Sequence, residues 1–269
     1  ACGNPDGIEA SFWASLCGRI PKYGKHDPKN RFGNCLVEIE KPIETSEDWD
    51  LLGYIIGKKA PQYSTPVMKG QFVRPNIYKF KQFAASCAVV SNIDMVHIVG
   101  MTPEALTEEM AFGGKEPDSY LKVTEADFAW AVSQLSDPGE GSVNYVTLGC
   151  PHYSIYEIQQ VAEYVKGKKV APGVTFHVWT NYAMRALARL NGYEKIIQDA
   201  GGELMAAHCP YGIFEYPNVR DAIMPVNAGL VTDSVKIAAD LPPMCNPGVR
   251  TYYGDTWRCI DAAVRGSWR

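Results

Sequence analysis

The feature that most constrains the fold of this chain is the repeated order of strand, polar turn and helix from residue 143 onward. The first unit has an alternating strand from Val143, and then Ser154 and Glu157 in the S-x-x-E spacing of a helix capping box. The same order recurs at 174–181, 203–210, 229–236 and 251–255. Because strands that alternate with helices form parallel sheets covered on both faces, the sequence predicts an α/β fold.

The N-terminal half shows a less regular order. We expect helices at 8–17, 49–58, 77–90 and 125–135, and strands at 35–40, 65–68 and 95–99. A further helix is expected at Thr102-Pro103-Glu104, because proline is favoured at the first helical position and acids in the first turn. The polar loop 20–34 is long enough to be functional. The Pro- and Gly-containing break at 137–141 predicts two parts, 1–136 and 142–269.

Composition narrows the classes of partner. The chain has 269 residues, a formal net charge of -4 and a pI near 5.8, so neither nucleic acid nor an anionic membrane is an expected partner. It has no apolar run of membrane-spanning length and no signal-peptide pattern, and we expect a cytoplasmic protein. Neither G-x-G-x-x-G nor a P-loop is present, so a nucleotide cofactor has no support.

Two of the eight cysteines, Cys150 and Cys209, follow expected strands and precede proline. The carboxyl ends of parallel strands face one crevice, so these thiols should converge there with Thr180-Asn181 and with 232–236. Cysteines from separate strand ends can bind an iron–sulfur cluster, whose open iron acts as a Lewis acid, but two cysteines do not hold one. The alternatives are that both are buried structural thiols and that His152 and His208 only form hydrogen bonds.

Several segments together resemble the large, catalytic part of the aconitase X family. They are YGKHDPKNR at 23–31, LLGYIIGKK at 51–59, HIVGMTPEA at 97–105, LGCPHYSIYEI at 148–158, GYEKIIQDAGG at 192–202 and the closing YYGDTWRCIDAAVRG. The resemblance implies an aconitase-like fold of parallel sheets flanked by helices. It also implies a hydro-lyase, or dehydratase, that acts on a small hydroxy acid with an iron–sulfur cluster, of [2Fe–2S], [3Fe–4S] or [4Fe–4S] type.

The resemblance also implies roles for single residues. Cys150 and Cys209 match two of the family's cluster cysteines. The segment TDSVK resembles a T-N-S-x-K motif, which makes its Ser234 and Lys236 the candidate catalytic residues. Candidate substrate contacts are Asn4, Asp6, Tyr23, His26, Thr102, Thr180, Asn181 and Thr232. Two positions depart from the family: Cys2 stands where arginine is expected, which removes a carboxylate or phosphate clamp, and Asp233 replaces asparagine, which adds negative charge.

The expected partners follow from what the resemblance leaves out of this chain. A small swivel-domain subunit should carry the general base, and another polypeptide should supply an N-terminal segment with the third cysteine. The substrate is expected to be a small acid, with cis-3-hydroxy-L-proline favoured over mevalonate 5-phosphate because a phosphate needs more positive charge than Lys236 and Arg31 provide. Two alternatives stay open: a cluster-free, non-catalytic binding or assembly subunit, and thiol chemistry at Cys150 with His152 as base.

Overall fold

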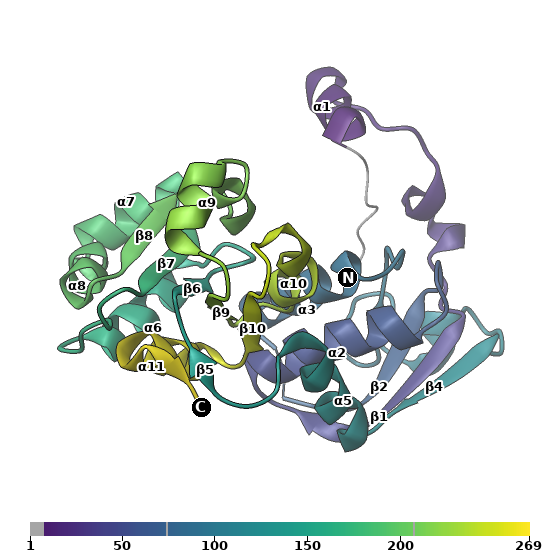
Figure 1. Ribbon diagram of the computed structural model, residues 1–269. Coiled ribbons are helices and arrows are strands. Elements are labelled where there is room, and N and C mark those ends of the chain that lie inside the picture. The colour runs from purple at the N-terminus through teal and green to yellow at the C-terminus, as the bar shows by residue number, and fades with distance from the viewer. Residues whose placement is uncertain (1–7, 74, 207) are drawn as a thin grey trace.

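The computed structural model describes residues 8–73, 75–206 and 208–269, which form two helix-covered sheets and a projecting N-terminal arm (Figure 1). The first sheet has the strand order β3-β2-β1-β4 within the described residues. Its strands are β1 (Cys35–Ile43), β2 (Pro66–Phe72), β3 (His97–Ile98) and β4 (Ser119–Val123). β1 lies between β2 and β4 and is parallel to both, with Leu36 opposite Val67 on one side and Tyr120 on the other.

Three helices cover the first sheet: α2 (Ser46–Lys59), α3 (Ile77–Val89) and α5 (Glu125–Leu135). α2 starts at a capping box between Thr45 and Asp48, and its Trp49 is fully buried against the rings of Phe72, Phe80 and Phe83. Aromatic side chains of this size dominate the energetics of a core. The predicted helices and strands of this region are present, and β4 is an additional strand that the pattern did not predict.

The helix expected at Thr102 is wrong. Residues 101–106 form turns, and the next helix, α4 (Glu108–Phe112), begins after Thr107. The Thr102 hydroxyl accepts from the Ile98 amide at 3.0 Å and donates to the Ile98 carbonyl at 3.3 Å. Because the hydroxyl points back along the chain, it closes a tight turn after β3 and does not cap a helix ahead of it.

The second sheet has the strand order β10-β9-β6-β7-β8 in the described part of the chain, and every pairing is parallel. Its strands are β6 (Tyr145–Leu148), β7 (Thr175–Thr180), β8 (Glu203–Ala206), β9 (Gly229–Thr232) and β10 (Arg250–Tyr253). Val146 of the central strand lies opposite Phe176 on one side and Val231 on the other. The predicted parallel α/β sheet is confirmed.

Helices cover both faces of the second sheet. One face packs against α6 (Ile155–Val165), α7 (Tyr182–Leu190), α8 (Tyr193–Ala200) and α11 (Thr256–Arg265). The other face packs against η3 (Pro210–Ile213), α9 (Pro217–Ile223) and α10 (Val235–Asp240), a 3-10 helix and two short helices. The two predicted capping positions, Ser154 of α6 and Asp255 of α11, both accept from main-chain amides, which confirms these helix starts.

The order of the strands creates a switch point in the second sheet. The chain runs from β6 outward through β7 to β8, and then returns to place β9 on the opposite side of β6. The connection that leaves β6 goes to one face of the sheet, and the connection that leaves β9 goes to the other. In open parallel sheets, this divergence opens a crevice at the carboxyl ends of the two strands. The turns after Leu148 and after Thr232 therefore flank this crevice.

α10 joins the two halves of the molecule. Its Val235 and Ala238 belong to the core of the first sheet, whereas Ile237 belongs to the core on the second sheet. Figure 1 shows α10 beside α3, between the two sheets. The break at 137–141 lies between α5 and β5 (Gly141–Ser142), and the division into 1–136 and 142–269 stays a prediction.

The remaining elements lie at the edges. α1 (Ile8–Cys17) stands apart from both sheets, with Phe12, Trp13 and Leu16 each more than half exposed (Figure 1). η1 (Gly24–His26) and η2 (Pro28–Asn30) lead from this arm to β1, η4 (Pro242–Met244) follows α10, and β11 (Ser267–Trp268) pairs antiparallel with β5. None of the helices in the described ranges has the length and apolarity needed to span a membrane.

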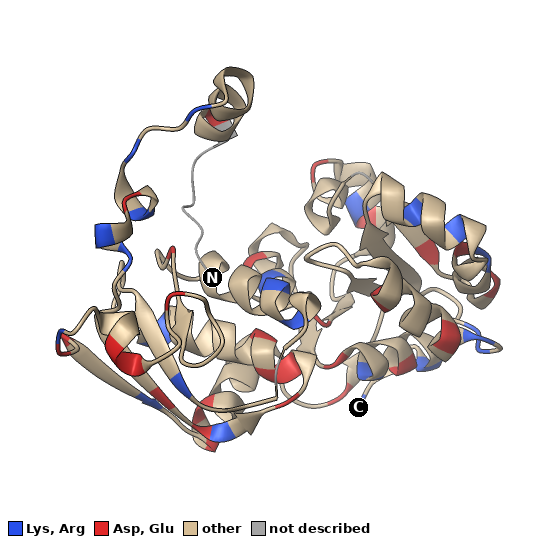
Figure 2. Ribbon diagram, turned by 180° about the vertical axis from the view of Figure 1, so that it is seen from behind, with Lys and Arg blue, Asp and Glu red and all other residues tan. Residues whose placement is uncertain are grey.

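Charged residues of both signs are interspersed along the ribbon of the two halves (Figure 2). Lys69 lies 3.3 Å from Glu38 and 3.2 Å from Glu108, and Lys122 lies 2.6 Å from Glu40, so the outer face of the first sheet carries paired charges. Exposed pairs of this kind contribute only about 0–1 kcal/mol each. The stability of the fold therefore rests on its buried groups.

One glycine is required where the crevice begins. Gly149, between β6 and Cys150, has a φ of +89°, and a Cβ there would lie 2.3 Å from the main-chain oxygen of Trp179. We predict that Gly149→Ala lowers the free energy of unfolding by about 2–5 kcal/mol, the sum of a left-handed backbone penalty and overpacking. Gly173→Ala is the control, since Gly173 has a φ of +82° with nothing within 4 Å of the added Cβ. Urea denaturation of both variants measures the difference, and equal losses would contradict the predicted backbone contact.

Candidate functional site

The turn after β6 carries Cys150 at the switch point. Its thiol is half-buried and packs against the apolar cluster that includes Tyr145, Trp179 and Leu230. Burial raises the pKa of the Cys150 thiol to about 11, while the ammonium of Lys236 and the hydroxyl of Ser234 act to lower it. The turns after β6 and β9 are therefore close enough for their side chains to interact.

Cys209 joins this group from the turn after β8. Cys209 is one of the groups close enough to act on the Cys150 thiol, and the pKa of Tyr211, raised chiefly by burial and by the Asp240 carboxylate, responds to both cysteines. The Tyr211 hydroxyl donates to Asp240 at 3.0 Å and to the carbonyl of Lys236 at 3.4 Å, and the Lys236 ammonium lies 6.0 Å from the Tyr211 ring. Tyr211 therefore connects the segment that carries Cys209 to α10.

The two histidines next to the cysteines form hydrogen bonds to the main chain. His152 Nε2 donates to the carbonyl of His208 at 2.7 Å, and the amide of Cys209 donates to His208 Nδ1 at 2.9 Å. The contact leaves Nδ1 as the ring nitrogen of His152 with a lone pair, and no hydrogen bond joins His152 to the Cys150 thiol among the described residues. Together with the raised pKa of Cys150, this contact gives no support to thiol catalysis by a Cys150–His152 pair.

Ser234 and Lys236 lie on the turn after β9. Ser234 is the cap residue of α10, and its hydroxyl accepts from the Ile237 amide at 3.4 Å. The amide of Ser234 in turn donates to the hydroxyl of Thr232 at 3.2 Å. These local bonds hold the turn in one conformation, which places Ser234 and Lys236 on the side of Cys150.

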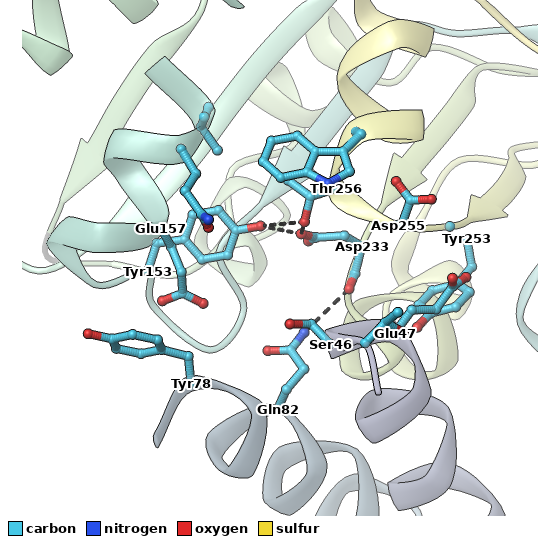
Figure 3. A pocket seen from close by; sticks show the side chains of 15 residues that line it. Ser46, Glu47, Tyr78, Gln82, Tyr153, Glu157, Asp233, Tyr253, Asp255 and Thr256 are labelled. Carbon is cyan, nitrogen blue, oxygen red and sulfur yellow. Dashed lines mark hydrogen bonds between the residues drawn. The ribbon is translucent and has the colours of Figure 1, made fainter. Parts of the chain in front are cut away.

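Asp233 lies on the other side of the same turn, where it lines a pocket of about 260 Å³ (Figure 3). Tyr153 and Thr256 both donate to its Oδ2, Thr256 at 2.7 Å, while Oδ1 is buried with no hydrogen-bond partner in the described part of the chain. Burial raises the pKa of Asp233 to about 6, and the two hydrogen bonds act in the opposite direction. A carboxyl group here is therefore held partly protonated.

The other acidic residues around this pocket are explained by their positions at the starts of helices. Glu47 lies in the first turn of α2, Glu157 in the first turn of α6, and Asp255 caps α11. Negative charge is stabilising at a helix N-terminus because the main-chain amides there point outward. The pocket is acidic because several helices begin around it, as Figure 3 shows for Glu47, Glu157 and Asp255.

The helices of the first sheet hold both turns of the crevice. Lys81 of α3 donates to the carbonyl of His152 and to Glu157, each at 2.7 Å. Gln82 of α3 donates to the carbonyl of Asp233 at 3.3 Å, and Asp50 of α2 accepts from the Val235 amide at 2.9 Å. The candidate site in the second half is therefore positioned by polar side chains from the first half.

The structure brings the segments of four predicted residues together: Cys150 packs on the same apolar cluster as Tyr211, which follows Cys209 by two residues, and Ser234 and Lys236 lie close enough to act on the Cys150 thiol. The threonines among the predicted substrate contacts are buried, with their hydroxyls bonded to nearby main chain: Thr102 to Ile98, Thr180 to Tyr153 and Thr232 to Ser234. Asn181 caps α7 through the Met184 amide. Tyr23 and His26 pack together on η1, with ring centroids 5.5 Å apart, and Asn4 and Asp6 lie outside the described residues. Their role in substrate binding stays a prediction.

Four residues that position the site were absent from the prediction: Asp50, Lys81, Gln82 and Tyr211. Asp50 left a signal in the sequence, since an acid between Trp49 and Leu51 falls on the apolar side of an amphipathic helix. The other three are ordinary surface residue types on helices or turns. Only the packing of the two halves gives them their partners.

With this geometry established, comparisons identify the family. The family model described as "Aconitase X second domain" matches residues 33–133, and the one described as "Aconitase X third domain" matches residues 143–265.

The chain belongs to the aconitase X family.

Curated relatives agree with this assignment. The chain is 30% identical over 260 residues to a cis-3-hydroxy-L-proline dehydratase of Hypocrea jecorina, covering 94% of this chain and 42% of that protein. It is also 30% identical over 260 residues to a phosphomevalonate dehydratase large subunit of Methanothermobacter thermautotrophicus, covering 96% of this chain and 60% of that protein. The chain thus spans less than two thirds of the length of these aconitase X proteins.

A solved structure shows the same fold. Holo-form aconitase X of Thermococcus kodakaraensis superposes with a TM-score of 0.79 at 24% identity, over 98% of this chain and 63% of the other. The aconitase-like α/β fold that the resemblance implied is confirmed.

The buried Asp233 predicts a pH dependence of stability. Its folded-state pKa of about 6 exceeds the ordinary value of 3.8, so the folded protein keeps a proton that the unfolded chain has released. Its contribution to the free energy of unfolding therefore falls as pH rises from about 4 to about 6, by up to about 3 kcal/mol. The Asp233→Asn variant should lose less stability over this pH range than the wild type. The control variant Asp199→Asn, at an exposed position of α8, should lose as much as the wild type. Urea midpoints at pH 4.5 and 6.5 measure both, and a wild-type slope in Asp233→Asn would contradict the assignment.

Proposed function

We propose that this chain forms the second and third domains of a hydro-lyase that eliminates water from a small hydroxy acid. The observation that carries the proposal is the meeting of Cys150, Cys209, Ser234 and Lys236 at the switch point of the second sheet. The two thiols are potential metal ligands, and the hydroxyl and the ammonium can bind a carboxylate. The dehydratase names of the relatives support the same reaction class.

The thiols of Cys150 and Cys209 fit as two ligands of an iron–sulfur cluster. Both are free and half-buried, and Cys209 is close enough to act on the Cys150 thiol. The described residues contain no group of three or more candidate ligands, so a further ligand has to come from outside them. When bound, such a cluster supplies a Lewis acid that makes a substrate hydroxyl a better leaving group.

The residues of this chain bind and orient the substrate. The Lys236 ammonium supplies the positive charge on this side of the turn, and it can pair with a substrate carboxylate. The Ser234 hydroxyl can donate to the same carboxylate while its oxygen still accepts from the Ile237 amide. Tyr211 holds the main chain of Lys236, which limits how far this residue can move away. The proton acceptor is proposed to come from a small swivel-domain subunit.

For the substrate we propose cis-3-hydroxy-L-proline. The positive charge that acts on the Cys150 thiol comes from the single ammonium of Lys236, whereas Asp233 faces the pocket on the other side of the turn. A doubly charged phosphate is poorly matched to this single charge, and an amino acid with one carboxylate and one ammonium suits it better. Phosphomevalonate dehydratase large subunits are equally similar in sequence, so mevalonate 5-phosphate is the competing substrate to test.

The partner proposal follows from the relatives. Several are named as large subunits, and this chain spans only part of them. We propose that the working enzyme contains this chain, a polypeptide region with the third cysteine and a small subunit.

Cysteine variants test the cluster. In the complete enzyme, purified without oxygen, Cys150→Ala and Cys209→Ala should lose bound iron and sulfide and lower the rate of cis-3-hydroxy-L-proline dehydration by a factor of about 10³ or more. Cys245→Ala is the control, since Cys245 is also half-buried but bonds to the carbonyl of Leu241. Iron and sulfide analysis with a substrate-depletion assay gives both readouts. An iron-free wild-type enzyme that still dehydrates the substrate would refute the cluster, and an iron-free inactive assembly would favour the non-catalytic alternative.

Lys236 tests carboxylate binding. Lys236→Met should raise KM for cis-3-hydroxy-L-proline by about 10-fold or more, because the ammonium pairs with the substrate in ground and transition states alike. Lys168→Met is the control, since Lys168 pairs with Asp261 at 3.3 Å in another part of the third domain. Steady-state assays with both hydroxyproline and mevalonate 5-phosphate measure the change. Turnover of the phosphate alone would reject the substrate proposed above.

A further inference from the structure

Asp50 is a buried carboxyl group in the middle of α2. It is 1% exposed and accepts from the Val235 amide at 2.9 Å and from the Tyr253 hydroxyl at 3.1 Å, both at Oδ2, and from the Ser86 hydroxyl at Oδ1. The donors come from α3, α10 and β10, so elements of both halves meet at one side chain. A buried carboxyl costs free energy unless its partners satisfy it, and here both oxygens are satisfied.

The Val235 amide is a group that needs such a partner. It is in the first residue of α10, where a main-chain N–H has no acceptor within the helix, and Val235 is fully buried. The cap residue Ser234 serves a different amide, that of Ile237. Asp50 is therefore the acceptor that holds the first N–H of α10.

Val235 lies between the two residues of the proposed site. Ser234 precedes it and Lys236 follows it, so the position of its peptide group sets the direction of both side chains. A second bond from the same half of the molecule, from Gln82 to the carbonyl of Asp233, holds the residue before Ser234. The turn is thus held at two successive points by α2 and α3.

We propose that Asp50 is a positioning residue that holds Ser234 and Lys236 against Cys150 by accepting the Val235 amide. The inference rests on the function proposed above for Ser234 and Lys236, whereas the hydrogen bond itself can be tested without it. Among the described residues Asp50 makes no hydrogen bond to the Cys150 thiol; its carboxyl acts on that thiol through space, and it acts on Ser234 and Lys236 through the main chain of 234–236.

The choice of variants follows from the contacts. In Asp50→Asn the amide oxygen can take the place of Oδ2 and still accept from Val235 and Tyr253. Its NH₂ group then faces Ser86, whose oxygen can accept once its single hydrogen turns from Asp50 to the carbonyl of Gln82, 2.9 Å away. Asp50→Ala removes the acceptor altogether. Asp50→Ser, which keeps a polar group too short to reach Val235, replaces the alanine variant should the latter not fold.

The first measurement is amide hydrogen exchange in the complete enzyme, followed by mass spectrometry of a peptide that covers 233–240. Exchange at Val235 should rise by about 10-fold or more in Asp50→Ala, because the buried Val235 amide then has lost its acceptor. Asp50→Asn should stay within about 3-fold of the wild type, since it keeps an acceptor. Thr124→Ala is the control, because it removes the capping box of α5 and destabilises the first half without touching 233–235.

The second measurement is the dehydration rate. In Asp50→Ala, kcat should fall by about 10- to 100-fold through misplacement of Ser234 and Lys236, and Asp50→Asn should restore most of it. Thr124→Ala should leave kcat unchanged. Unchanged Val235 exchange in Asp50→Ala overturns the proposal, and so does faster exchange with an unchanged kcat. A wild-type enzyme without dehydratase activity refutes the proposed function instead, while the exchange data still decide whether Asp50 holds the turn.

Discussion

The parallel pairing of β6 with β9 is the constraint on which the rest of the site depends. These strands are far apart in the chain, and their pairing places the turn with Cys150 beside the turn with Ser234 and Lys236. A shift of one residue in this register would turn every side chain of β9 to the other face of the sheet. Burial of Val146 and Val231 in the core prevents such a shift, so apolar packing determines where the polar chemistry occurs.

A second constraint is the polar contact between the two halves. Lys81, Gln82 and Asp50 hold the two turns of the crevice, although all three belong to the helices of the first sheet. Removing one partner of a buried polar bond leaves the other unsatisfied, which costs about 1–3 kcal/mol. The proposed site therefore depends on these three side chains of the first half as well as on its own sheet.

Much of the secondary structure could be predicted, because capping boxes and alternating strands are local signals. Ser154 with Glu157 and the helix after Asp255 are examples. The helix expected at Thr102 failed because its hydroxyl bonds backward to Ile98, a choice that the residue type alone does not fix. β4 was missed because Tyr120 and Lys122 face solvent on an edge strand, which weakens the apolar pattern.

The amino-acid order alone specified where the strands of the second half end and their helices begin, and so it placed Cys150, Cys209 and 232–236 at strand ends; the resemblance to the family singled out Ser234 and Lys236. The tertiary structure decided which of these candidates meet, since strand order and register depend on contacts between distant segments. It also decided which polar groups are already satisfied by the main chain, as for Thr180 and Thr232. Finally, it gave Asp50 a role that a lone acid in an apolar helix only hinted at, because the partner of a buried carboxyl is determined by packing.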